Sequence, residues 1–367
     1  MVINLSGLIS RREMADGSLR IGRILGIDIE LHWLFILLIL AFVLFSPAQD
    51  ALLWILLFVC VLIHELSHSV TALRNGVRVS RIILLPIGGV SVMDNPSTDP
   101  AVEFNIAMAG PIMSLFLGAL FGVAVLFTPM GIATYIVQYL FLLNVLLGLF
   151  NIIPAFPMDG GRVLRSYLQK RMGLYRATMQ TARISRYCMA LIIIGSVAFV
   201  VWPSSYSLSY RYFLLLMDLV VVFFLYGGMK AEEDSVKLKQ QTKGMKIAMA
   251  ATEDYALVGY NSSIKSLYDA VRRKKEHIVL AKAPDGKYML VNIFNKSALS
   301  GVQKVKDALI AVPNIDGSTG IADALGTIEQ SNFRLGVVVS KGELVGIATS
   351  SHINAFLALH LTKKKGF

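Results

Sequence analysis

Six long apolar runs constrain the fold of this 367-residue chain more than any other feature. A helix needs about 20 mostly apolar residues to cross a bilayer, and runs of roughly that length lie at residues 31–47, 51–73, 104–128, 132–153, 187–203 and 212–229. The composition agrees, because 55% of the residues are hydrophobic and only 16% are charged. The sequence therefore predicts a polytopic α-helical membrane protein with about six transmembrane helices in a lipid bilayer.

The distribution of arginine and lysine predicts the orientation of these helices. Cytoplasmic loops carry an excess of basic residues, and basic residues here precede the first run and follow the second and the fourth, whereas the opposite loops contain Arg211 alone. We therefore expect both termini in the cytoplasm and, since no organelle signal is found, a location in the plasma membrane. The net charge of +11 then reflects topology and anionic lipid, and we expect no nucleic-acid partner.

The composition changes after residue 230, which divides the chain into parts. Residues 1–29 form a predicted cytoplasmic segment, 30–230 the membrane domain, and the charged stretch 231–244 a flexible linker. Residues 245–367 alternate short β-branched runs with helical patterns and end in a basic tail, so they predict a soluble α/β domain. Its two halves share an order of amphipathic helix, strand, glycine turn and strand, which indicates an internal repeat.

Two histidines and a glutamate lie at the end of the second run, in the segment HELSH of residues 64–68. Positions i and i+4 of a helix lie one above the other, so His64 and His68 can offer two imidazole nitrogens to one metal ion. Glu65 can then accept a proton from water at that metal. An ionisable residue at the centre of a span costs at least about 2.5 kcal/mol, which a metal would offset. The alternative is an ordinary polar helix end beyond the membrane boundary.

A third ligand is expected from the segment NIIPAFPMDGGR, residues 151–162, at the cytoplasmic end of the fourth run. Its depth matches that of HELSH, and Pro154 and Pro157 break the helix just before Asp159. Irregular backbone at membrane depth is tolerated where it lines a buried or wet cavity. A catalytic zinc site needs three protein ligands, so we predict that Asp159 joins the two histidines.

These segments resemble the site-2 proteases, a family of intramembrane zinc metalloproteases. The resemblance rests on HELSH (64–68), LLPIGGVSVM (84–93), FNIAMAGPIMS (104–114) and NIIPAFPMDGG (151–161), which occur in this order. It implies that His64, His68 and Asp159 bind one zinc ion per chain and that Glu65 is the general acid/base. It also implies that Asn151 lies near the substrate carbonyl. The expected substrate is a transmembrane segment of a membrane-tethered regulatory protein.

Three further features of the membrane domain remain open at this stage. The stretch from Ile82 to Met93 predicts a strand and a Gly-Gly turn, which can either pair with an extended substrate or merely shield the cavity. The AGPIMS segment is explained by close helix packing. Asp218 lies inside the sixth run and can either line a gate or pair with a basic residue.

The C-terminal domain resembles a pair of CBS domains, which accompany one branch of this protease family. The second repeat, residues 320–353, is the better match, and the first is diverged. The resemblance implies an adenine-nucleotide site in which Thr349 takes part, although His352 stands where an aspartate is expected. A purely structural or dimerising role, giving a homodimer through the CBS domains, is the other interpretation.

Two other classes of function compete with a protease. One is a CBS-regulated transporter or channel, with Asp218 and the histidines along an ion path. It predicts paired broken helices and an internal repeat in the membrane part, which the sequence does not clearly show. The other is an inactive member that binds membrane proteins without cutting them. The presence of every catalytic position argues against it.

Overall fold

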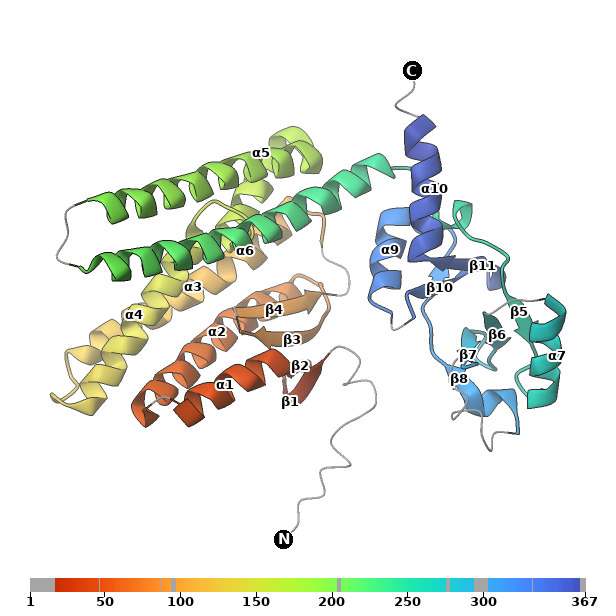
Figure 1. The fold of residues 1–367 in the computed structure, drawn as a ribbon, viewed down its shortest axis with the longest axis horizontal. Helices are drawn as coiled ribbons and strands as arrows, with labels where there is room; N and C mark the ends of the chain where they lie inside the picture. Colours follow the sequence, from red (N-terminus) through yellow and green to blue (C-terminus); the bar gives the residue numbers. More distant parts are fainter. Residues whose placement is uncertain are drawn as a thin grey trace, which may run out of the picture. The chain divides into compact units, whose positions relative to one another are not determined.

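The computed structural model describes residues 17–45, 47–86, 88–93, 97–202, 206–274, 278–293, 303–331 and 333–363. The chain forms two compact units, residues 1–236 and 237–367, which we describe separately (Figure 1). The first sixteen residues and the last four, which include most of the predicted cytoplasmic N-terminal segment and of the basic tail, lie outside the described residues.

Six helices build the membrane unit in the part of the chain that the structure describes. They are α1 (Trp33–Phe45), α2 (Ala48–Arg74), α3 (Pro100–Val125), α4 (Ile132–Ile152), α5 (Asp159–Val201) and α6 (Leu208–Gln241). Within the described ranges, the five helices α2 to α6 are long and apolar enough to cross a membrane. The predicted first span is shorter than expected, because α1 has only 13 residues, about 20 Å at 1.5 Å per residue.

The first span is short because the chain enters it from a strand. Strand β1 (Ser18–Ile24) and strand β2 (Ile27–His32) form an antiparallel hairpin that ends directly at Trp33, the first residue of α1. The two residues of its turn, Leu25 and Gly26, both have positive φ values, of 52° and 85°, as tight hairpin turns require. The sequence did not predict this hairpin.

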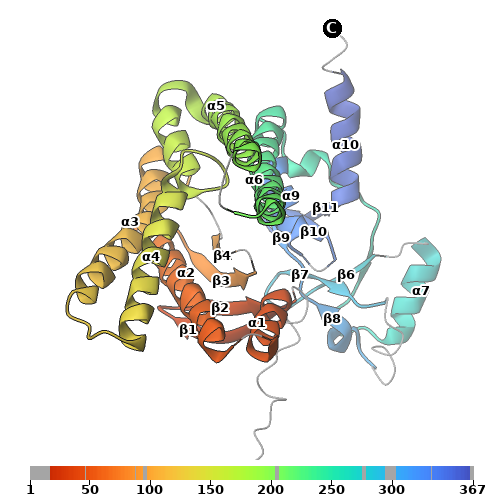
Figure 2. The same ribbon diagram turned by 60° about the vertical axis from the view of Figure 1, so that its left-hand side comes forward.

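A four-stranded sheet covers one side of α2. Strands β3 (Val79–Leu85) and β4 (Gly88–Met93) form a second hairpin, and the strand order is β1-β2-β3-β4. The strand was predicted, but the Gly-Gly pair expected to form the turn lies at the start of β4 and pairs with the end of β3. The buried residues of β2 and β3, including Ile29 and Ile82, share a core with α1 and α2. This packing sets β4, the last strand of the sheet, alongside α2, as both views show (Figure 1 and Figure 2).

Helix α5 consists of two helices joined at Gly173, which has a φ of 78° and interrupts the helical backbone. Glycine adopts this conformation without steric cost. The basic residues predicted to follow the fourth span lie on the first part and on the beginning of the second part as far as Arg186, and the predicted span 187–203 follows them.

Residues 231–241, predicted to begin a flexible linker, instead continue α6 to Gln241. Their charged side chains form ion pairs that support a helix: Lys230 with Asp234 one turn later, and Glu232 and Glu233 with arginines of α5. The charged residues of this stretch therefore form ion pairs within α6 and with α5, and do not serve solvation alone.

The C-terminal unit has the α/β repeat that the sequence predicts. The order helix, strand, strand occurs twice among the described residues, and short strands β5, β8 and β9 complete two sheets in the orders β5-β6-β7-β8 and β11-β10-β9. The elements are β5 (Ala256–Val258), α7 (Ile264–Lys274), β6 (Val279–Lys282), β7 (Tyr288–Val291), β8 (Leu309–Ile310), β9 (Asn314–Asp316), α9 (Ile321–Glu329), β10 (Leu335–Ser340), β11 (Glu343–Thr349) and α10 (Ser350–Lys363).

Candidate metal centre

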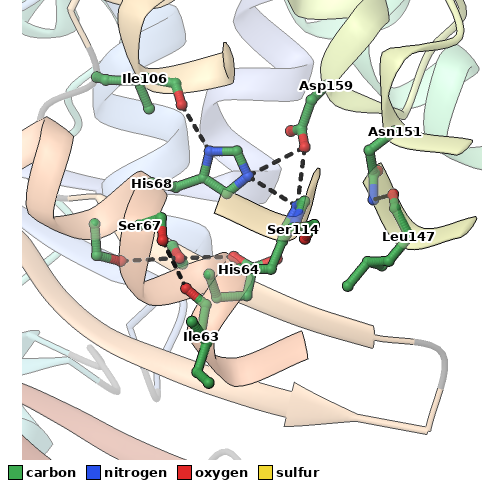
Figure 3. Close-up of polar contacts among 12 residues, drawn as sticks. Ile63, His64, Ser67, His68, Ile106, Ser114, Leu147, Asn151 and Asp159 are labelled. Carbon is green, nitrogen blue, oxygen red and sulfur yellow. Dashed lines mark hydrogen bonds and ion pairs between the residues drawn. The ribbon is translucent and has the colours of Figure 1, made fainter. Parts of the chain in front are cut away.

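The fold brings the three predicted ligands together. His64 and His68 lie one turn apart on α2, and Asp159 is the first residue of α5 (Figure 3). The Nε2 atoms of the two histidines are 3.1 Å apart, and each lies 3.1 Å from Oδ2 of Asp159. Both histidines are buried, with exposed fractions of 4% and 6%. Their ligand atoms form the His-His-Asp cluster of the described residues.

Hydrogen bonds on the far side of each ring determine which nitrogen faces the cluster. Nδ1 of His68 lies 2.7 Å from the carbonyl oxygen of Ile106, which can only accept, so Nδ1 carries the hydrogen and Nε2 of the neutral ring presents a lone pair. Nδ1 of His64 lies 2.9 Å from Oγ of Ser114. Partners of this kind orient metal-binding histidines. When the Ser114 hydroxyl accepts from Nδ1 of His64, Nε2 of that ring also presents a lone pair. Two lone pairs and a carboxylate oxygen then converge on one position, which suits a cation.

The spacing of the three atoms suits zinc. Tetrahedral zinc binds imidazole nitrogen and carboxylate oxygen at about 2.0–2.1 Å, which separates neighbouring ligand atoms by roughly 3.3 Å. The separations of 3.1 Å are close to this value. Two imidazoles and one carboxylate also leave a fourth position for water or substrate, as catalytic zinc sites do.

Gly110 of α3 lies against both ligand nitrogens. A Cβ atom at this position would overlap Nε2 of His68 and would lie 2.6 Å from Nε2 of His64. Gly110 shares one face of α3 with Ile106 and Ser114, at intervals of four residues, so this face holds both histidine rings and leaves room at their tips.

Asp159 is positioned by the loop between α4 and α5. The N–H of Phe156, a fully buried residue, donates a 2.8 Å hydrogen bond to Oγ of Ser185. Gly160 and Gly161 follow Asp159, and a Cβ atom at either position would overlap backbone atoms of this loop. The two glycines therefore let the first turn of α5 pack directly on the loop that precedes it.

Glu65 stands beside the cluster without belonging to it. Its Oε2 accepts a 2.8 Å hydrogen bond from Oγ of Ser91 in β4, and Ser91 in turn accepts a 3.1 Å bond from Oγ of Ser69. Gly89 of the same strand faces the glutamate, because a Cβ atom there would lie 2.5 Å from Cγ of Glu65.

The other residues singled out from the sequence make hydrogen bonds outside the cluster. Nδ2 of Asn151 donates a 3.0 Å hydrogen bond to the carbonyl of Leu147 on its own helix (Figure 3). Thr349 lies in the C-terminal unit, where its Oγ1 is 2.8 Å from Oγ of Ser351 and accepts the N–H of His352 at 3.2 Å. Asp218 accepts a 2.5 Å hydrogen bond from Ser196 of α5, a neutral partner rather than the basic residue considered above.

Ser91, Gly110 and Ser114 were not singled out by the sequence analysis. The spacing of Ile106, Gly110 and Ser114 was a usable signal, because a stripe at every fourth position marks one helix face. Ser91 carried no such signal, since its role depends on the pairing of β4 with β3 and on the packing of the sheet against α2.

Comparison with known proteins agrees with this centre. Residues 52–132 and 128–195 match peptidase family M50. A zinc metalloprotease of Methanocaldococcus jannaschii is 32% identical over 342 residues, which cover 92% of this chain and 95% of that protein.

Among solved structures, a site-2 protease from Methanocaldococcus jannaschii is 38% identical, with a TM-score of 0.44, over 59% of this chain and 95% of that one. CBSX2 in complex with AMP is 19% identical, with a TM-score of 0.27, over 32% of this chain and 99% of that one. The near full-length relationship to a zinc metalloprotease, together with the family match across the metal centre, is decisive. This chain therefore belongs to peptidase family M50 and is a zinc metalloendopeptidase of the site-2 protease type.

Proposed function

We propose that this protein binds one zinc ion through His64, His68 and Asp159 and cuts a transmembrane segment of a membrane-tethered regulatory protein near the cytoplasmic face. The observation that supports this most is the meeting of two imidazole nitrogens and a carboxylate oxygen at 3.1 Å, on helices long enough to cross a membrane. Two buried imidazole nitrogens and one partly buried carboxylate oxygen in this arrangement are suited to a divalent cation.

Bound zinc acts as a Lewis acid, which makes water more acidic and polarises the substrate carbonyl. Glu65 takes the proton from the attacking water and delivers it to the nitrogen of the leaving amine. The peptide bond is thereby cleaved with the addition of one water molecule. Asn151 donates an amide N–H toward the substrate carbonyl, since its NH₂ group has a second hydrogen beside the one bonded to Leu147.

The peptide bonds of a substrate helix are protected by their own hydrogen bonds, so the substrate must unwind locally before attack. Strand β4 offers a place for the unwound segment, because among the described strands it pairs with β3 alone. An extended substrate added to this edge gains main-chain hydrogen bonds that replace those of its helix. Glu65 packs against the same strand, so a substrate on β4 lies next to the catalytic base.

For the C-terminal unit we propose a regulatory CBS pair. Its two halves repeat the order of helix, strand and strand, and Thr349 lies at the end of β11, where the resemblance implies a nucleotide contact. Titration of the purified protein with AMP tests this, with Thr349→Val as the variant expected to weaken binding. Light scattering of the same sample determines whether it is a homodimer.

We further propose that both termini are cytoplasmic and that the protein resides in the plasma membrane. The basic residues of the N-terminal part, of the α2–β3 connection and of the first part of α5 support this orientation.

The deciding experiment measures zinc content and cleavage of a single-span test substrate by the detergent-purified protein. We expect about one zinc per chain in the wild type, loss of most zinc in Asp159→Ala, and full zinc but no cleavage in Glu65→Gln. A wild type without metal, or a Glu65→Gln variant that cuts normally, overturns the proposal and favours the transporter interpretation.

A further inference from the structure

We infer that Ser91 is a positioning residue for the catalytic base, and that strand β4 carries a cradle for Glu65 built from Gly89 and Ser91. This inference rests on the function proposed above. It assigns a role to a strand residue that bonds the glutamate and acts through it.

The alternation of side chains along β4 creates the cradle. Residues two apart in a strand point to the same face, so Gly89 and Ser91 share a face while Val90 and Val92 occupy the other. Gly89 provides space, because any Cβ atom there would lie 2.5 Å from Cγ of Glu65. Ser91 provides a donor, because its hydroxyl gives a 2.8 Å hydrogen bond to Oε2 of Glu65.

A second serine fixes the direction of that hydrogen bond. Ser69 lies on α2, one turn after Glu65, and is fully buried. Its hydroxyl donates to Oγ of Ser91 at 3.1 Å, so the hydrogen of Ser91 is left to point at the carboxylate. The chain from Ser69 through Ser91 to Glu65 therefore ends on one oxygen of the base and leaves the other oxygen free to accept the proton from water.

Fixing the carboxylate affects the reaction rather than substrate binding. A glutamate next to a metal ligand has rotamers that point its carboxylate away from the attacking water, and a hydrogen bond to one oxygen selects the productive one. Since β4 is also the proposed substrate strand, the same segment sets the position of both the scissile bond and the base. A substrate that pairs with β4 is then brought into register with Glu65.

The test compares Ser91→Ala, Ser91→Thr and Ser80→Ala by zinc content, kcat and KM on the single-span test substrate. Ser80 is the matched control: it lies on β3, and its exposed hydroxyl bonds the carbonyl of Val92 rather than the glutamate. We expect Ser91→Ala to keep its zinc and its KM and to lose about tenfold in kcat, the size of effect of a hydrogen bond to a charged group. Ser91→Thr, which keeps the hydroxyl, should recover kcat to within about threefold of wild type.

Two results would overturn the inference. If Ser91→Ala has the kcat of Ser80→Ala, the hydrogen bond does not matter for the base. If Ser91→Ala loses zinc or raises KM instead, Ser91 supports the metal centre or the substrate rather than Glu65. Both outcomes leave the proposed protease function intact, because that function fails only if Glu65→Gln cleaves or the wild type lacks zinc.

Discussion

At the scale of single residues, the His-His-Asp cluster and Glu65 depend on neighbouring glycines, which leave space because they have no side chain. Gly110 leaves room at the tips of both histidines, and Gly89 leaves room for the carboxylate of Glu65. The rings themselves are held from behind by the Ile106 carbonyl and the Ser114 hydroxyl. Gly110 and Ser114, which belong to the AGPIMS segment, therefore shape the surroundings of the two histidines. The sequence analysis explained this segment by helix packing alone.

Replacing Gly110 by alanine should empty the metal site. The added methyl group overlaps Nε2 of His68 and lies 2.6 Å from Nε2 of His64, so the rings must turn away from the position the metal needs. We expect Gly110→Ala to lose most of its zinc and its cleavage activity, as measured by elemental analysis and substrate cutting. Gly195→Ala on α5, where no atom lies within 4 Å of the added Cβ, should keep both. Retention of zinc by Gly110→Ala would contradict this prediction.

Replacing Ser114 by alanine should weaken zinc binding without abolishing it. The substitution removes the 2.9 Å partner of Nδ1 in His64, and loss of such partners typically costs about 10- to 100-fold in metal affinity. Competition with a chelator measures the affinity, and added zinc should restore cleavage. Ser67→Ala serves as control, because Ser67 bonds only the Ile63 carbonyl of its own helix. Equal affinities for the two variants would rule out the proposed role of Ser114.

At the scale of elements, a largely buried arginine joins three helices around the loop that precedes Asp159. Arg165 of α5 forms ion pairs with Glu103 of α3 and, at 2.7 Å, with Glu232 of α6. Its guanidinium also lies 5.2 Å from the centre of the Phe156 ring. Gly228 of α6 packs on Pro157 of the same loop. The position of Asp159 therefore depends on α3 and α6 as well as on its own helix.

Replacing Arg165 by alanine should destabilise the membrane unit strongly. The side chain is only 12% exposed, and its loss leaves Glu103 and Glu232 partly buried without this cation, a cost of about 3–5 kcal/mol. Denaturant unfolding in detergent measures the free energy of unfolding. Arg162→Ala is the control, because that side chain is 44% exposed and makes a single 3.3 Å pair with Glu232, which contributes about 1 kcal/mol or less. A similar change in both variants would contradict the prediction.

The elements also show what could be predicted from the sequence. Hydropathy located α2 to α6, and the i, i+4 histidines with the loop before Asp159 located the three side chains that the fold clusters, because both signals are local. The β1–β2 hairpin is local, but β2 is held in the sheet by pairing with β3, which lies far away in the sequence. The extension of α6 to Gln241 escaped prediction because its ion pairs also join residues far apart in the sequence. The proposed role of Ser91 could not be predicted either, because β4 contacts Glu65 only in the folded chain.

At the scale of the whole molecule, the helices and loops define an orientation that labelling can test. Met130 is fully exposed at the turn between α3 and α4, on the side opposite to the basic loops. Asp285 lies in the turn between β6 and β7, with its side chain 59% exposed. The two native cysteines, Cys60 and Cys188, are free and can be replaced beforehand.

In intact cells, a membrane-impermeant maleimide should label Met130→Cys and should label Asp285→Cys only after permeabilisation. This outcome follows if the C-terminal unit is cytoplasmic, as the distribution of basic residues predicts. The reverse pattern would invert the topology and would move the metal centre to the outer face.

The distance along the chain between the ligands has a consequence for biosynthesis. His64 and Asp159 are 95 residues apart, and a ribosome adds roughly 5–20 residues per second. For several seconds after α2 has been made, the growing chain therefore carries Glu65 and both histidines but lacks the carboxylate that completes the centre. If these side chains bind zinc as proposed, a newly made chain is inert while its first helices enter the membrane, and it becomes a cutting enzyme only once α5 has followed.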